Sequence, residues 1–229
     1  MTRFILALAL ALPLAAQPTD RYAMVFLRPS PDRKPLPKDE GEKIQAAHMA
    51  HIRSMADSGA LVAAGPFDDT PATISGVFIF KGPIEEARRL ANEDPTVKAG
   101  RNLVELYVWM GPKGIGEEYV KLHKADPKTP EDMGVHPFLM FRRGPNWSRA
   151  REFVSEHLEY VERLRSEGKL AAAGPIAEGP DDLAGVFVFQ RIPDADARRL
   201  AEQDPFVKNG AATIEPHRWW CAAHVLPGW

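Results

Sequence analysis

Cysteine is nearly absent from this chain. Cys221 is the only one among 229 residues. One cysteine cannot form an internal disulfide, so the fold must be stabilised by its core, even if the protein is exported to an oxidising compartment. We predict that Cys221 is an inert packing residue rather than a nucleophile.

The short motifs of several well-known chemistries are also missing. The sequence contains no HExxH, no CxxC, no phosphate-binding glycine loop and no GxSxG, which argues against the corresponding metal, nucleotide and serine-hydrolase sites. The histidine and aspartate that recur once in each half would still lack the third ligand of a metal site. We therefore expect no metal and no cofactor: nothing indicates a nucleotide, a flavin or a haem.

An excess of charge of one sign is lacking as well. Lys and Arg number 29 and Asp and Glu 31, for a net charge of −2. Proteins that bind nucleic acids or anionic membranes usually carry a strongly basic face. The net charge of −2 gives no reason to expect either partner. The composition, with 45% apolar and 26% charged residues, is that of an ordinary globular protein.

The chain begins with an apolar run, from Phe4 to Leu14, that follows the basic residue Arg3. Small residues come next, and this order predicts a secretory signal over residues 1–17. The run is shorter than the ~20 residues that span a bilayer. A cut after Ala16 would place Leu14 where a small residue is usual. We expect export to the periplasm or the extracellular space, without stable membrane insertion once the leader is removed.

The rest of the chain contains one unit twice. Residues 59–100, which begin GALVAAGP, return at 168–210, which begin GKLAAAGP. The offset is 109 at Pro66 and 110 at Asp94, so one residue was inserted near Pro193. A unit of about 110 residues has the size of a small domain and is too long for a solenoid repeat.

Both copies show the same order of elements. Short apolar runs predict strands, and apolar residues at helical spacing predict helices, in the order β-α-β-β-α-β. The expected strands are 22–27, 61–64, 74–80 and 103–110 in the first copy, and 138–141, 170–173, 183–189 and 213–220 in the second. The expected helices are 38–58, 84–92, 148–166 and 194–201, with a short helix near 117–123.

This order is that of ferredoxin-like domains. A four-stranded sheet with both helices on one face leaves its other face bare, and two fused copies can cover each other. We predict an α+β fold in which two ferredoxin-like repeats, 20–111 and 136–222, pack sheet to sheet as an intrachain α+β barrel. Residues 112–135 would form the linker and 223–229 a tail. The protein would then be a monomer that contains an internal pseudo-dimer.

Polar residues kept in both copies are the candidates for function, because apolar positions have drifted between the copies. His48 and His157 fall on the apolar face of the first helix of their copy, so their imidazoles should point at the sheet. A buried imidazole needs a hydrogen-bond partner. A satisfied core histidine and a functional one both fit this pattern.

Asp94 and Asp204 each precede a proline, which is typical of a helix N-cap with proline at the first helical position. The same carboxylate could meet the imidazole, fix its tautomer and favour its protonated form. A His–Asp pair in a pocket is a plausible general acid or base near neutral pH. Capping and catalysis are compatible, because a carboxylate has several lone pairs.

Gly65-Pro66 and Gly174-Pro175 close the second strand of their copies. They would either end the strand or let a ligand approach the backbone, which would make them substrate-binding residues.

Two further pairs of charged residues are shared. Arg28 and Arg143 end the first strand of their copies, where they would be solvated or would bind a substrate carboxylate. Glu105 and Glu215 lie within the last strand and would be either a third member of the site or an ion pair between the sheets.

These strings together resemble the YCII-related family. The first copy has His48, GALVAAGP, GVFIF, ARRLANEDPTVKAG and a closing strand that ends in Trp109. The second has His157, GKLAAAGP, GVFVF, ARRLAEQDPFVKNG and Trp219. The resemblance covers most of both copies and leaves out the leader, the linker and the tail.

The resemblance implies small α+β proteins that pair as dimeric barrels, with an active site on His48 and Asp94 and on His157 and Asp204. The family is similar in fold to muconolactone isomerase, whose chemistry is proton transfer and elimination. This chain departs from the common family pattern by its tandem fusion and its predicted export, and the export puts a substrate from intermediary metabolism in doubt.

Two functions of different kinds are left open. The first is a small-molecule enzyme of the lyase or isomerase type, with the histidines as acid or base. The second is a non-catalytic exported module that binds a small ligand or a protein and keeps the His–Asp pairs for structure. A purely structural barrel would have no ligand-sized pocket near these residues.

Overall fold

A computed structural model describes residues 19–70 and 73–227. The predicted secretory signal lies outside these residues. Within these two ranges, no helix combines the length and the apolar character that crossing a bilayer requires.

Both copies form the predicted β-α-β-β-α-β unit. The first repeat consists of β1 (Thr19–Pro29), α1 (Lys38–Asp57), β2 (Leu61–Pro66), β3 (Gly76–Lys81), α2 (Ile84–Asn92), α3 (Pro95–Lys98) and β4 (Asn102–Pro112). Helix α4 (Glu117–Ala125) lies in the connection. The second repeat consists of β5 (Gly134–Arg143), the 3-10 helix η1 (Trp147–Phe153), α5 (Val154–Ser166), β6 (Leu170–Glu178), β7 (Leu183–Phe189), α6 (Asp194–Glu202), α7 (Pro205–Lys208) and β8 (Ala212–Cys221).

The first and last strands of each repeat are longer than their apolar runs predict. Strands β1 and β4 pair over eleven positions, from Thr19 opposite Pro112 to Pro29 opposite Asn102. The pairing continues beyond the apolar run of each strand, and an apolar pattern cannot show this. The predicted helix 148–166 is divided, because its first part forms η1 and only the rest is α-helical.

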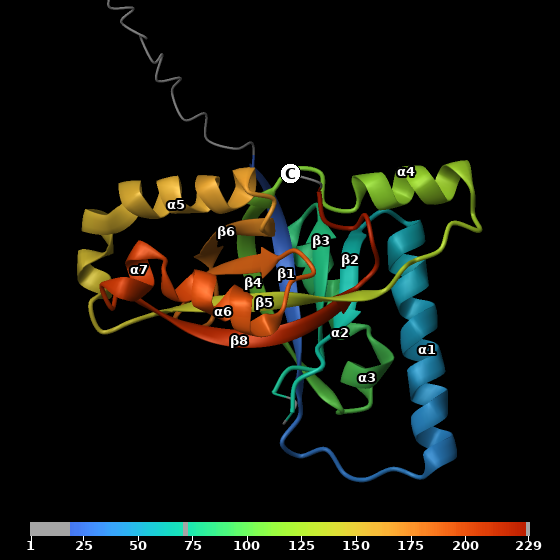
Figure 1. The fold of residues 1–229 in the computed structure, drawn as a ribbon. Coiled ribbons are helices and arrows are strands. Elements are labelled where there is room, and N and C mark those ends of the chain that lie inside the picture. The colour runs from blue at the N-terminus through green and yellow to red at the C-terminus, as the bar shows by residue number, and fades with distance from the viewer. Residues whose placement is uncertain (1–18, 71–72, 228–229) are drawn as a thin grey trace, which may run out of the picture.

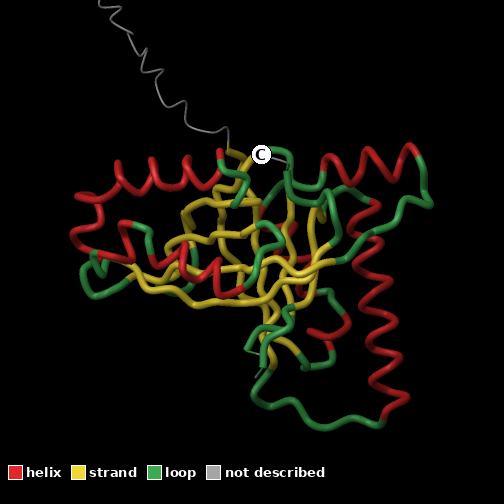
Figure 2. The backbone as a smooth tube through the Cα atoms, viewed as in Figure 1, coloured by secondary structure: helices red, strands yellow, loops and turns green. Residues whose placement is uncertain are grey.

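The eight strands form one antiparallel sheet in the order β2-β3-β1-β4-β6-β7-β5-β8. Strand β4 joins β6 through Val108 opposite Glu178 and Trp109 opposite Ile176. At the other seam, the bridge between Phe67 and Trp219 joins the chain just after β2 to β8. The sheet therefore curls into a barrel with the helices outside, as Figure 2 shows. The predicted intrachain α+β barrel is confirmed.

Four strands of the barrel, β1, β3, β5 and β7, bury both of their faces over most of their length. On β1, Tyr22, Met24 and Phe26 belong to the barrel interior, whereas the alternate residues pack under the helices. This explains why the strands have near-continuous apolar runs. The interior is filled by large side chains, among them Trp109 and Trp219, which are fully buried.

One end of the barrel is covered by the connection and the C-terminal tail. The amide of Gly116 donates to the carbonyl of Val225 (2.7 Å), and that of Tyr119 donates to His224 (3.1 Å). Figure 1 shows α4 next to the C-terminal tail. Cys221 is buried here, and burial raises the pKa of its thiol to about 12, which agrees with an inert packing residue.

The seams between the two repeats depend on two glycines. A Cβ on Gly65 would overlap the carbonyl oxygen of Trp220, and one on Gly174 would overlap that of Met110. The strands that meet at the seams thus approach each other more closely than any residue type other than glycine would allow at these two positions. Gly65 and Gly174 serve barrel closure, whichever further role they have.

We expect Gly65→Ala and Gly174→Ala each to lower the free energy of unfolding by about 1–3 kcal/mol, because the new methyl group forces the seam apart. Urea unfolding would measure the loss. The matched control is Gly41→Ala in α1, where a Cβ has nothing within 4 Å, and this change should instead stabilise the helix by ~0.5–1 kcal/mol. Equal effects at all three glycines would contradict the close approach.

Candidate functional site

In the first repeat, His48 of α1 meets Asp94, which lies just before α3. The Nδ1 atom of His48 is 2.6 Å from Oδ2 of Asp94. The carboxylate is fully buried, whereas the imidazole side chain is 15% exposed. The ring stacks on Phe78 of β3, with 6.0 Å between ring centroids. The imidazole thus lies between the helices and the outer face of the sheet, with one edge toward solvent.

Asp94 also caps α3, and its two oxygens divide the two roles. Oδ1 accepts hydrogen bonds from the backbone amide (2.9 Å) and the hydroxyl (2.5 Å) of Thr96. Oδ2 faces the imidazole. A carboxylate can only accept, so Nδ1 of His48 is the donor, and the neutral ring keeps a lone pair on Nε2.

The second repeat repeats this geometry. Nδ1 of His157 is 2.7 Å from Oδ2 of Asp204, whose Oδ1 caps α7 by accepting from the amide of Phe206 (2.8 Å). The side chains are 18% and 0% exposed. The imidazole stacks on Phe206, at 4.2 Å between centroids, and on Phe187, at 6.1 Å.

The surroundings of the two pairs differ. In the first repeat, the hydroxyl of Thr96 accepts from Asn102 (2.9 Å), whose side-chain oxygen accepts from Ser75 (2.7 Å). Three apolar residues occupy the corresponding positions of the second repeat. They are Phe206, Ala212 and Ala184. The first pair therefore belongs to a polar network, and the second lies among aromatic and small side chains.

Asp94 is held in its ionised form. Burial raises the pKa of its carboxyl group, but the hydrogen bonds from His48 and Thr96 outweigh burial and lower the pKa below its ordinary value. A fixed negative charge at Oδ2 keeps the Nδ1 proton in place and would stabilise an imidazolium.

The predicted arginines and glutamates lie elsewhere. Nε of Arg28 is 2.6 Å from Oε2 of Glu105 on the neighbouring strand. Phe26 and Met140 stand opposite Glu105 and Glu215. The residue that corresponds to Arg28 is therefore the one two positions after Met140.

That residue is Arg142, so the predicted correspondence of Arg28 with Arg143 was wrong. Nε of Arg142 is 2.5 Å from Oε2 of Glu215. Arg143 is exposed and lies over the ring of Trp147. The two adjacent arginines made the alignment of this strand ambiguous.

Arg28 and Glu105 share the barrel side of their strands with Phe26 and Tyr107, whereas His48 lies on the helix side. The sheet therefore separates these arginine–glutamate pairs from the His–Asp pairs. Each glutamate forms an ion pair within its own sheet rather than between the sheets. Two prolines, Pro66 and Pro175, are exposed in the edge strands at the seams.

A further histidine links the two repeats, and sequence comparison of the copies missed it. On β8, Nδ1 of His217 is 2.6 Å from Oδ2 of Asp69, and Nε2 is 3.1 Å from Oε1 of Glu215. Carboxylates only accept, so both ring nitrogens must carry hydrogen and the ring is an imidazolium. The corresponding residue of the first repeat is Tyr107, so a search for shared residues passes over this position.

The profile of the YCII-related domain matches residues 22–110 and 119–219. The uncharacterized protein YjpA of Bacillus subtilis (strain 168) is 28% identical over 69 residues, which make up 30% of this chain and 78% of that protein.

Solved structures with a similar fold include a heme-binding protein from Thermus thermophilus, with a TM-score of 0.51 and 14% identity over 91% of this chain and 95% of that one. The putative chlorite dismutase TA0507 has a TM-score of 0.52 and 12% identity over 90% and 95% of the two chains. At these identities the likeness concerns the fold alone.

The lowered pKa of Asp94 makes its contribution to stability depend on pH. The contribution is present above the ordinary pKa of 3.8 and is lost as the pH falls through the lower value of the folded state. We expect Asp94→Asn to cost about 1–3 kcal/mol at neutral pH and much less in acid. Unfolding from neutral pH down to acid would measure this difference. Asp57→Asn, at an exposed carboxylate of α1, is the control and should show no such convergence.

The raised pKa of His217 predicts the opposite dependence of stability on pH. Burial lowers the pKa of His217, but the hydrogen bonds to Glu215 and Asp69 outweigh burial and raise the pKa above 6.5. Its contribution to stability is full below 6.5 and is lost as the pH rises through the raised value. Asp69→Asn should therefore destabilise the protein more at slightly acid than at alkaline pH, measured by urea unfolding. A loss that does not change with pH, or one that the exposed neighbour Asp68→Asn reproduces, would rule this out.

Proposed function

Because the chain belongs to the YCII-related family, we propose that it is a small-molecule enzyme of the lyase or isomerase type. His48 and His157 would act as general acid or base, and Asp94 and Asp204 would orient them. We further propose export to the periplasm or the extracellular space, on the strength of the leader pattern in residues 1–17.

One observation carries this proposal: each repeat holds an imidazole by Nδ1 and leaves Nε2 uncommitted. In the described part of the chain, Nε2 of neither His48 nor His157 has a hydrogen-bond partner. Both side chains are partly exposed while their aspartates are fully buried. A buried carboxylate that fixes the tautomer of a solvent-reachable imidazole is the arrangement that a general base requires.

The proposed reaction is a proton transfer at a substrate carbon. The lone pair of Nε2 takes a proton from a substrate carbon next to a carbonyl group, and the electrons of that C–H bond move into the conjugated system. The imidazolium that forms is stabilised by the aspartate at Nδ1. In an isomerisation it returns the proton to another carbon, and in an elimination it gives the proton to the leaving group.

The competing function is a binding module without catalysis. The stacking of the imidazoles on Phe78 and Phe187 suits a structural role, because it buries most of each ring. Among the described residues, hollows of about 390 and 490 Å³ lie elsewhere, and neither histidine lines them. We therefore expect a substrate to bind at the open edge of the imidazole.

Replacement of the aspartates by asparagine separates these functions. The side-chain oxygen of asparagine can still cap the short helix, but its amide donates to Nδ1 and forces the ring hydrogen to Nε2, so the base is lost while the fold is kept. We expect nitrogen NMR shifts of the imidazoles to report hydrogen on Nδ1 in the wild type and on Nε2 in the Asp94→Asn, Asp204→Asn variant.

Exchange of substrate protons in D₂O would then test catalysis without knowledge of the full reaction. In a panel of unsaturated lactones that includes muconolactone, the wild type should exchange a proton next to the carbonyl, and the double variant should be slower by about 10²–10⁴-fold. Equal exchange by both proteins would refute the base. Binding of a lactone without any exchange by the wild type would establish the binding module instead.

A further inference from the structure

A hollow of about 390 Å³ lies at the covered end of the barrel, away from both His–Asp pairs. Its walls come from three segments: the connection, the second repeat and the C-terminal tail. The residues that line it include Glu118, His136, Gln190, Arg191, His224 and Leu226. This volume is within the range of small-ligand sites.

His136 of β5 supplies a buried acceptor to this hollow. The residue is only 6% exposed, and Nδ1 donates to the carbonyl of Phe189 (2.8 Å). Among the described residues, none is a partner of Nε2. Burial, together with the charge of Arg191, holds the pKa of His136 below its ordinary value. The neutral form of the ring is therefore favoured, and its Nε2 can accept a hydrogen bond from a ligand.

Arg191 supplies a positioned cation. Its guanidinium binds the side chain of Asp132 (3.1 Å) and also that residue's carbonyl oxygen. It lies so close to the backbone of Gly134 that a Cβ there would overlap it. Asp132 occupies only part of the five N–H donors of an arginine, so donors are left for a ligand carboxylate.

The backbone is strained at two points around the hollow. Among the residues that the structure describes, Asp132 (φ 44°) and His224 (φ 63°) are the non-glycine residues with a left-handed backbone. Asp132 anchors Arg191, and His224 is part of the wall. Left-handed conformations of non-glycine residues collect at functional sites.

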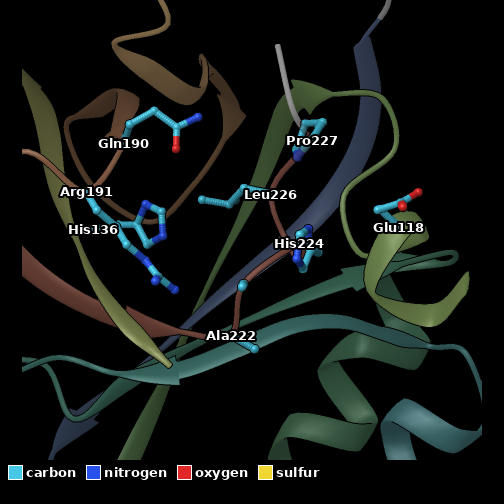
Figure 3. A pocket seen from close by; sticks show the side chains of 9 residues that line it. Glu118, His136, Gln190, Arg191, Ala222, His224, Leu226 and Pro227 are labelled. Carbon is cyan, nitrogen blue, oxygen red and sulfur yellow. The ribbon is translucent and has the colours of Figure 1, made fainter. Parts of the chain in front are cut away.

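The first repeat does not have this arrangement. His136 and Tyr22 correspond, because they stand opposite Trp219 and Trp109. Tyr22 is fully buried and its hydroxyl donates to the carbonyl of Pro112 (3.0 Å). The shorter imidazole of His136 does not reach as far. Figure 3 shows the side chains of His136, Gln190 and Leu226 turned toward a common space.

We propose that this hollow is a second ligand site, distinct from the His–Asp pairs, that binds a small hydroxycarboxylate with an apolar body. The hydroxyl group donates to Nε2 of His136, the carboxylate accepts from Arg191, and the body packs on Leu226. Glu118 on the wall adds negative charge, which selects a single carboxylate over a dicarboxylate.

The test is an NMR titration of the full chain with meta-hydroxybenzoate at neutral pH. We expect binding to be weakened at least ~10-fold, or about 1.4 kcal/mol, by His136→Gln and by Arg191→Gln. Benzoate lacks the hydroxyl group, so the wild type should bind it at least ~10-fold more weakly than it binds meta-hydroxybenzoate. His136→Gln keeps an amide that can donate to Phe189, and Arg191 is exposed, so at least this second variant should fold if the first does not.

His157→Gln makes the same chemical change at a His–Asp pair and is the matched control. Unchanged binding in His157→Gln and weakened binding in Arg191→Gln support the second site. The proposal is overturned if the wild type fails to bind at about 10 mM, if Arg191→Gln binds as tightly as the wild type, or if the loss occurs in His157→Gln instead. None of these results depends on whether the His–Asp pairs are catalytic.

Discussion

The close approach of the two repeats at their edge strands is the constraint on which the rest of the structure depends. Each four-stranded sheet has an apolar face that only the other sheet covers, and the cover is complete only if the edges meet. Gly65 and Gly174 allow this, because any side chain there would collide with a carbonyl oxygen of the other repeat. The tryptophans of β4 and β8 then fill the interior and make the barrel a packed core rather than a pore.

Closure of the barrel determines on which face of the sheet the His–Asp pairs can lie. Because the inner face is occupied by packing, the His–Asp pairs lie on the outer face, where helix and sheet meet. Each pair is built within one repeat, from α1 and the cap of α3 or from α5 and the cap of α7. Duplication therefore gives two separate His–Asp pairs, one within each repeat. The Arg28–Glu105 and Arg142–Glu215 pairs remain on the barrel face and satisfy each other there.

The sequence predicts what is local or repeated. The spacing of apolar residues gives the order of elements, and the bare face of one sheet, together with the duplication, implies the barrel. The His–Asp contact was one of two alternatives for Asp94, and the structure holds both roles on different oxygens. Contacts that cross between repeats could not be derived this way. Asp69 and His217 are 148 residues apart and have no identical counterparts in the other copy.

Divergence between the copies is as informative as their agreement. Thr96, Asn102 and Ser75 form one chain of hydrogen bonds, and all three have apolar counterparts in the second repeat. A chain of this kind leaves unpaired polar groups when one member is lost, so its members are expected to change together. The two copies also differ at the covered end of the barrel, where Tyr22 of the first repeat corresponds to His136 of the second. There, the connection between the repeats and the C-terminal tail form part of the wall of the hollow. The second repeat can therefore acquire a binding role without any change to the His–Asp geometry that both repeats keep.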